Sequence, residues 1–130
     1  MTSRANLTPE APWIQISTTE HDWDEAEPSL LTSMLSQLVL IRTFEEAALE
    51  LAAEGNIHGP AHSSIGQEGG AVGSVLPLTS ADTVNGSHRG HHQFIAKVLA
   101  HVAPHGIDPR EEFAADIHDV LLTTMAEICG

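Results

Sequence analysis

The chain has 130 residues, of which 18 are Asp or Glu and only 5 are Lys or Arg, so its formal net charge is −13. Nucleic acids and anionic membranes are bound by clustered Lys and Arg that replace counterions, so this charge balance argues against both kinds of partner. The single cysteine, Cys129, allows no intramolecular disulfide, and we expect a reducing, cytoplasmic location.

Residues 1–28 are rich in Pro, Thr, Ser and acidic side chains, and their one apolar island is the WIQI stretch at 13–16. This composition is typical of segments that bury too little apolar surface to become ordered. It also lacks the apolar core of a signal peptide and the basic pattern of a transit peptide. We predict an extended or disordered N-terminal arm over 1–28 and a single domain over 29–130.

The most secure element is a helix over 29–54, where Leu, Ile and Met recur at helical spacing. Ser29 is expected to cap its start, and Gly55 offers a left-handed stop. A Gly-Pro loop follows, and then a glycine-rich stretch in which Gly66 and Gly70, like Gly69 and Gly73, are four residues apart. Each glycine costs a helix about 1 kcal/mol relative to alanine, so a helix here implies close backbone approach to a neighbour; a loop over 66–70 is the alternative.

The second half of the chain predicts one strand and two helices. The stretch LTSADTVNG at 78–86 reads as a turn that leads into a short buried strand, and residues 91–103 are expected to form a short helix that Pro104 stops. The last helix is expected to begin at Asp108, with a proline in its first turn and a capping-box glutamate, and to end at Gly130.

Three histidines and an arginine, His88, Arg89, His91 and His92, fall within five residues. As a metal site the cluster is weak, because Arg89 would repel a dication and no carboxylate or thiolate lies nearby in sequence. An accident of composition in a chain with nine histidines is a second interpretation. An anion site is the most coherent one, because Gly90 permits close backbone approach, a helix begins near His91, and Arg89 supplies a fixed bidentate donor.

The segment from about residue 31 onward resembles the start of the alpha subunit, or the alpha half of a fused chain, of the thiamine-diphosphate-dependent 2-oxoacid dehydrogenases, the decarboxylating components of their complexes. The motifs that carry the resemblance occur in the family's order: Arg42 with Phe44-Glu45-Glu46, Gly55-x-Ile57-x-Gly59, His62, Gly66-Gln67-Glu68, and Arg89-x-His91. It implies an α/β thiamine-diphosphate-binding fold, of which residues 29–130 are the truncated N-terminal portion, mostly helical with one or two short strands.

The resemblance also implies roles for individual residues. Arg89 resembles the arginine that binds the cofactor's diphosphate, His91 the active-site histidine near the thiazolium, and His62 a histidine at the entrance to that site. His88 stands where family members carry tyrosine, so an imidazole would replace the phenol in the diphosphate contact. Arg42 is expected to be a structural ion-pair partner of Glu45, Glu46 or another helix.

Thiamine diphosphate and Mg²⁺ are the implied cofactors, but the Gly-Asp-Gly motif through which the family binds the metal is absent from the sequence. No metal ligand is therefore expected among these residues. The implied partners are a beta subunit or beta half, a lipoyl-bearing acyltransferase and a small 2-oxoacid substrate. We expect the chain alone to be inactive as the N-terminal piece of a longer enzyme. A non-catalytic acidic helical interaction module is the alternative.

Overall fold

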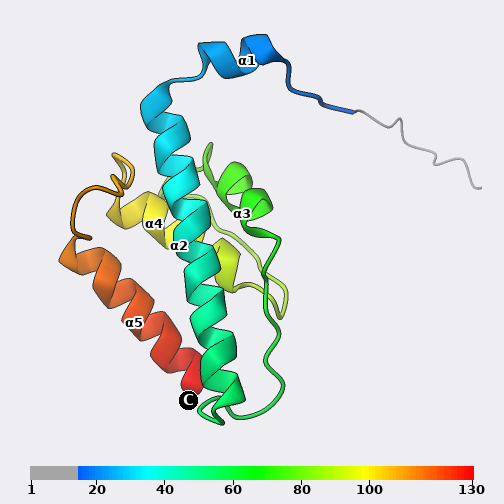
Figure 1. Cartoon of the computed structure of the whole chain (residues 1–130), viewed down its shortest axis with the longest axis vertical. Helices are drawn as coiled ribbons and strands as arrows, with labels where there is room; N and C mark the ends of the chain where they lie inside the picture. The colour runs from blue at the N-terminus through cyan, green and yellow to red at the C-terminus, as the bar shows by residue number, and fades with distance from the viewer. Residues whose placement is uncertain (1–14) are drawn as a thin grey trace, which may run out of the picture.

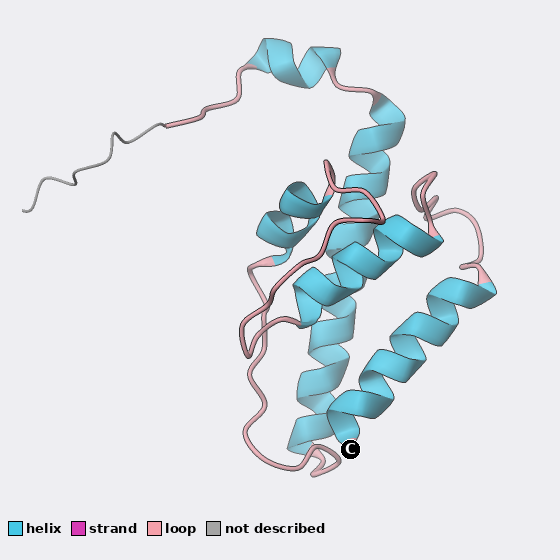
Figure 2. Ribbon diagram, turned by 180° about the vertical axis from the view of Figure 1, so that it is seen from behind, coloured by secondary structure: helices cyan, strands magenta, loops and turns pink. Residues whose placement is uncertain are grey.

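The computed structural model describes residues 15–130, which form five helices and no strand (Figures 1 and 2). The helices are α1 (Glu20–Glu25), α2 (Pro28–Ala53), α3 (Glu68–Val75), α4 (His91–Val102) and α5 (Ala115–Cys129). The prediction that this segment is mostly helical is confirmed. None of these helices has both the length and the apolar character needed to cross a membrane.

Helix α2 is the axis on which the others are arranged (Figure 1). It is the predicted helix of residues 29–54, but its start differs: Glu27 occupies the N-cap and Pro28 the first turn, so Ser29 is not the cap. Proline suits that position because it lacks only an N–H that would have no helical partner. Gly55 follows the helix with φ +83°, the left-handed stop expected from the sequence.

The core lies where α3, α4 and α5 pack against α2 and one another. Ile41 and Ile95 are fully buried, and Leu99 is almost so. The other members are apolar residues of these helices and of the segment before α5: Phe44, Ala71, Val72, Val75, Ala96, Ile107 and Ile117. Each of the helices α2 to α5 thus buries an apolar stripe and leaves its opposite face to solvent.

The glycine-rich stretch is helical only from Glu68, and Gly66 precedes it with a φ of +92°. The expected close approach of another backbone is not present in the described residues. A Cβ added at Gly69, Gly70 or Gly73 would meet no atom within 4 Å. Helix α3 therefore packs through Ala71, Val72 and Val75, and its glycines face outward.

The predicted strand before VNGS is not observed. Residues 82–87 run between α3 and α4 without helical or strand pairing. A strand needs a neighbour to pair its backbone groups, and none of the described segments lies beside this one as a strand. The α/β class accordingly stays a prediction.

Helix α5 begins at Ala115, seven residues later than the capping signals at Asp108 indicate. The Asp108 carboxylate accepts hydrogen bonds from the Arg110 backbone N–H at 3.0 Å and from its guanidinium Nε at 2.8 Å. Asp108 therefore closes a turn around Arg110 and does not cap a helix. The predicted end at Gly130 is confirmed, since α5 runs to Cys129.

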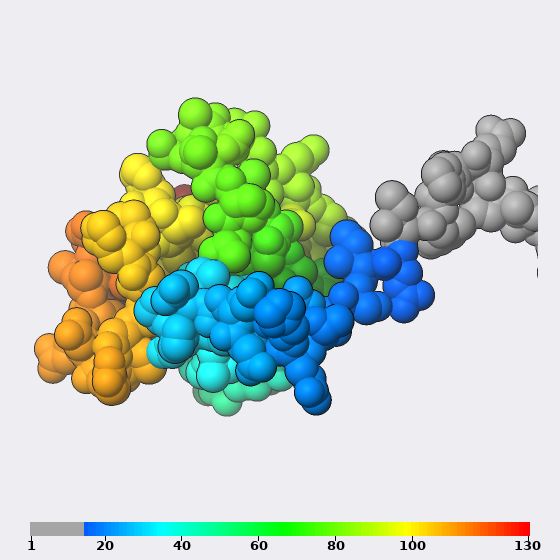
Figure 3. Space-filling model, turned by 90° about the horizontal axis from the view of Figure 1, so that it is seen from above, coloured from blue at the N-terminus to red at the C-terminus, as the bar shows by residue number. Residues whose placement is uncertain are grey.

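The described part of the predicted arm contains one short helix. Thr19 and Asp22 form a capping box at the start of α1, and every residue of α1 is exposed or partly exposed. Figure 3 shows this segment at the surface, beside the start of α2. Residues 1–14, including Trp13 of the apolar island, lie outside the described residues, while Ile16 and Trp23 are 90% and 58% exposed.

Candidate active site

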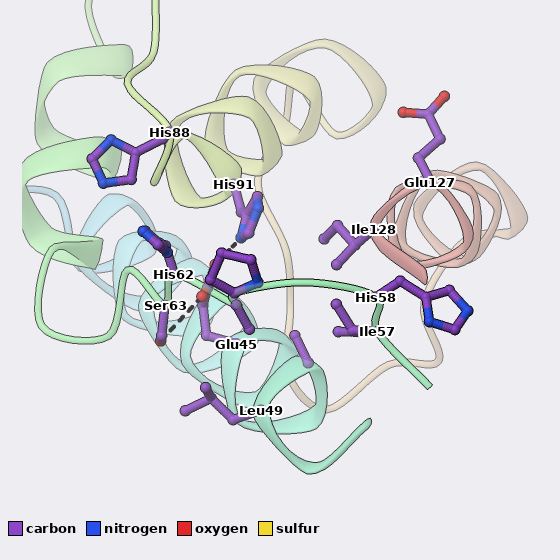
Figure 4. A pocket seen from close by; sticks show the side chains of 13 residues that line it. Glu45, Leu49, Ile57, His58, His62, Ser63, His88, His91, Glu127 and Ile128 are labelled. Carbon is purple, nitrogen blue, oxygen red and sulfur yellow. Dashed lines mark hydrogen bonds and ion pairs between the residues drawn. The ribbon is translucent and has the colours of Figure 1, made fainter. Parts of the chain in front are cut away.

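A hollow of about 520 Å³ lies between the C-terminal half of α2, the loop at 57–63, the start of α4 and the end of α5 (Figure 4). Four histidines line it: His58, His62, His88 and His91. The other lining residues are Glu45, Ala48, Leu49, Ile57, Pro60, Ala61, Ser63, Glu127 and Ile128. Imidazoles from two segments distant in sequence therefore gather on one cavity.

The three histidines predicted as site residues all face this hollow. His62 and His88 meet edge to face, with their ring centroids 4.8 Å apart. His91 is the first residue of α4, and its side chain is 28% exposed. The structure thus brings together the residues assigned separately to proton transfer and to cofactor contact.

Glu45 lies at the base of the hollow and was not predicted as a site residue. It is 1% exposed and projects from the apolar face of α2, beside Phe44 and one turn before Ala48. Its Oε2 accepts hydrogen bonds from the Ser64 backbone N–H at 2.9 Å and from the Ser63 hydroxyl at 3.2 Å. A carboxylate on an apolar helix stripe is the sequence signal that would have indicated a buried partner.

The other oxygen of Glu45 contacts His91. Glu45 Oε1 lies 3.1 Å from His91 Nδ1, within hydrogen-bond distance (Figure 4). The second ring nitrogen, Nε2, has no hydrogen-bond partner within residues 15–130 and is not among their buried unpartnered atoms. His91 is therefore held by one nitrogen and free to interact through the other.

Arg89 adjoins the hollow but does not line it. Its side chain is exposed, and its Nη1 donates a hydrogen bond to the Ser63 carbonyl at 3.3 Å. It stands two residues before the first residue of α4, where the backbone N–H groups of the helix carry partial positive charge. The turn from Ser87 to Gly90, which contains Arg89, is tight, since a Cβ at Gly90 would lie 2.9 Å from the Ser87 carbonyl oxygen.

A second hollow, of about 690 Å³, adjoins the first. The two share His88, His91, Glu127 and Ile128 as lining residues. The second extends toward Asp82 and Lys97 along the segment that precedes α4. His91 is thus accessible from two sides, and sequence analysis missed the contribution of α5 to both.

Arg42 belongs to a separate ion pair. Its Nε donates to Glu68 Oε1 at 2.6 Å, which links α2 to the start of α3 and confirms the expected structural role with another helix as the partner. Glu68 also accepts hydrogen bonds from the Gly66 backbone N–H at 3.0 and 3.1 Å. The hydrogen bond from Arg42 lowers the pKa of the Glu68 carboxyl to about 2, against the opposing effect of burial.

The metal-site interpretation of the histidine cluster has no geometric support in the described residues. His88 precedes α4 and His92 lies inside it, so the two do not share a helix face. His92 is 5% exposed and packs inward. Across residues 15–130, no three His, Cys, Asp or Glu side chains come together in a way that would hold an ion.

The chain is similar to the alpha subunit of acetoin:2,6-dichlorophenolindophenol oxidoreductase from Bacillus subtilis (strain 168), with 39% identity over 64 residues. This similarity relates about half of the present chain to an oxidoreductase alpha subunit. The matched segment makes up 49% of this chain and 19% of that protein, so it spans about a fifth of the relative's length. No family model matches the chain. No solved structure matches it either.

Proposed function

We propose that this chain forms the N-terminal part of the alpha subunit, or alpha half, of a thiamine-diphosphate-dependent 2-oxoacid dehydrogenase. Such an enzyme decarboxylates a small 2-oxoacid and passes the acyl group to a lipoyl arm. The observation that carries the proposal is the meeting of His62, His88 and His91 on one hollow beside Arg89. The partial similarity to an oxidoreductase alpha subunit supports the same assignment.

The residues present fit one end of an anionic cofactor. Arg89 offers an exposed, permanently charged guanidinium, and α4 begins two residues later with backbone N–H groups that have no partner inside the helix. These groups would bind the diphosphate, with His88 as a neighbouring donor. Thiamine diphosphate, when bound, supplies the carbanion chemistry that amino-acid side chains lack.

His91 and His62 are proposed to move or hold protons at the reacting end of the site. Imidazole suits this work because its ordinary pKa lies near neutral pH. His91 Nε2 is the atom proposed to exchange the proton, since Nδ1 is occupied by Glu45. Mg²⁺, a beta subunit and a lipoyl-bearing acyltransferase belong to the proposal, with the metal ligands and the remaining site groups supplied by other segments.

The first test is calorimetric titration of thiamine diphosphate and Mg²⁺ into the natural gene product assembled with its beta partner. Arg89→Ala should weaken binding by about 2 kcal/mol, roughly thirtyfold, because a charge-assisted contact to the diphosphate is lost. Arg110→Ala is the matched control, since Arg110 is an exposed arginine whose partner, Asp108, lies away from the hollow. It should bind the cofactor like the wild type.

The outcomes separate the alternatives. Equal binding by the wild type and Arg89→Ala would remove Arg89 from the diphosphate site. An absence of binding by the complete assembly would overturn the proposed function and favour the acidic interaction module. One observation favours that second candidate: a Cβ built at any of the outward glycines of α3 would meet no atom within 4 Å in the described residues, which leaves room for a partner there.

A further inference from the structure

Glu45 combines deep burial with a direct contact to a proposed catalytic group. Its side chain is 1% exposed, yet it faces neither a lysine nor an arginine within hydrogen-bond distance in the described residues. A buried carboxylate without such a partner is expensive to keep unless hydrogen-bond donors surround it. Three donors do so here: the Ser63 hydroxyl, the Ser64 N–H and the His91 ring.

The two oxygens of Glu45 divide these donors between them. Oε2 takes both serine contacts, which are fixed by the loop after α2, and Oε1 is left for His91 Nδ1. An ionised carboxylate only accepts hydrogen bonds, so this arrangement places the imidazole proton on Nδ1. Nε2 of the neutral ring is then an acceptor turned away from Glu45.

We propose that Glu45 is a positioning residue that sets the tautomer and the orientation of His91. It holds the proton on Nδ1 and presents an unprotonated Nε2 to the hollow, ready to accept a proton from a bound ligand. The role of His91 in catalysis rests on the proposed function. The tautomer itself does not, because it is a property of this chain without any ligand.

Glutamine at position 45 gives a sharp test because an amide has one accepting and one donating end. The Ser64 N–H is a fixed backbone donor and requires the amide oxygen. The amide NH₂ then faces His91 Nδ1, which must become an acceptor. Glu45→Gln should therefore move the imidazole proton from Nδ1 to Nε2, with almost no change in side-chain volume.

The measurement is a long-range ¹H–¹⁵N correlation spectrum of the full chain labelled at histidine, above the pH at which imidazoles are protonated. The resonances of His91 are identified by their loss in His91→Gln. The wild type should show Nδ1 protonated and Nε2 unprotonated, and Glu45→Gln the reverse. Glu50→Gln, an exposed glutamate of the same helix, is the matched control and should keep the wild-type pattern.

Two results would overturn the proposal. One is a wild-type His91 with its proton on Nε2, which decides the matter even if Glu45→Gln does not fold. The other is a folded Glu45→Gln chain that keeps the proton on Nδ1. A merely structural role for Glu45 would change stability without inverting the tautomer.

Kinetics of the assembled enzyme then connect the tautomer with the reaction. Glu45→Gln should lower kcat about a hundredfold, the scale of one lost proton transfer, while KM and cofactor affinity stay near their wild-type values. An unchanged kcat with an inverted tautomer would remove Glu45 from positioning His91 for the reaction. Wild-type assemblies that bind no cofactor would refute the proposed function and leave the tautomer result in support of Glu45 as the residue that positions His91.

Discussion

Two buried glutamates, Glu45 of α2 and Glu68 at the start of α3, differ in their partners. Glu68 meets the guanidinium of Arg42 and the Gly66 N–H, whereas within residues 15–130 Glu45 meets an imidazole, a hydroxyl and one backbone N–H and no charged arginine or lysine. Their exposed fractions, 6% and 1%, are similar. The difference lies in the partner, because arginine is always charged and histidine changes its protonation near neutral pH.

The comparison separates a structural ion pair from a candidate functional one. Arg42 and Glu68 hold two helices together through a bond that does not change over the physiological pH range. Glu45 and His91 join a helix to the rim of an accessible hollow through a group able to exchange protons. Burial of a carboxylate alone therefore does not indicate function; the chemistry of its partner does.

The largest effect is expected for Glu68→Ala. The substitution removes the acceptor for Arg42 and leaves the Gly66 N–H without its partner. We expect a loss of about 3 kcal/mol in the free energy of unfolding, at the low end for a broken buried pair because the Arg42 side chain is 43% exposed. Urea unfolding followed by circular dichroism measures it, and a loss as small as that of Glu50→Ala would contradict the structural role.

Glu45→Ala should cost less, about 2 kcal/mol. It leaves the Ser64 N–H unpaired, but the Ser63 hydroxyl and His91 are able to turn toward water in the hollow, and the burial cost of the carboxylate disappears. The same unfolding experiment gives the value. If Glu45→Ala is more destabilising than Glu68→Ala, the distinction between the two glutamates is wrong.

Acid should weaken the Glu68 pair. Its pKa is about 2 in the folded chain and 4.5 in an unperturbed glutamate, so its contribution is present above 4.5 and is lost as the pH falls toward 2. After allowance for water around Arg42, we expect about 1–2 kcal/mol to be lost between about pH 5 and about pH 3. The measurement is the difference in unfolding free energy between the wild type and Glu68→Gln at several pH values. A difference that does not change over this range would contradict the assignment.

The smallest effect is expected for the exposed pair of Arg110 and Asp108. The guanidinium lowers the pKa of the Asp108 carboxyl to about 2, yet the Arg110 side chain is 85% exposed and screened by solvent. Arg110→Ala should leave the urea midpoint at neutral pH unchanged within error. A clear shift of the urea midpoint would contradict this expectation and show that the exposed pair stabilises the fold.

Sequence patterns predicted the elements whose information is local. The long apolar periodicity gave α2 and its stop at Gly55, and Pro104 follows soon after the end of α4. The prediction that α5 begins at Asp108 was wrong, because the Asp108 carboxylate accepts hydrogen bonds from Arg110 and caps no helix. The strand was not found because strand formation depends on a neighbour, which a single segment does not encode.

The candidate site was predicted only in part, because some of its contacts join segments that are distant in the sequence. His62, His88 and His91 were identified, and the structure places them on one hollow. Glu45 and Ser63 were missed as partners because their contact joins a helix to a distant loop. The signal was present in the position of Glu45 on an apolar stripe, but its partner depended on how the loop folds back.

The hydrogen bond from Arg89 to the Ser63 carbonyl has a consequence for affinity. A guanidinium carries several N–H donors, and this bond to a neutral carbonyl occupies one of them, so the others stay available to an anion. The bond ties the arginine to the loop after α2 before any anion arrives, and less conformational freedom is then lost on binding. The affinity for an anion therefore depends on the position of this loop, which the contacts of Ser63 and Ser64 with Glu45 help to hold.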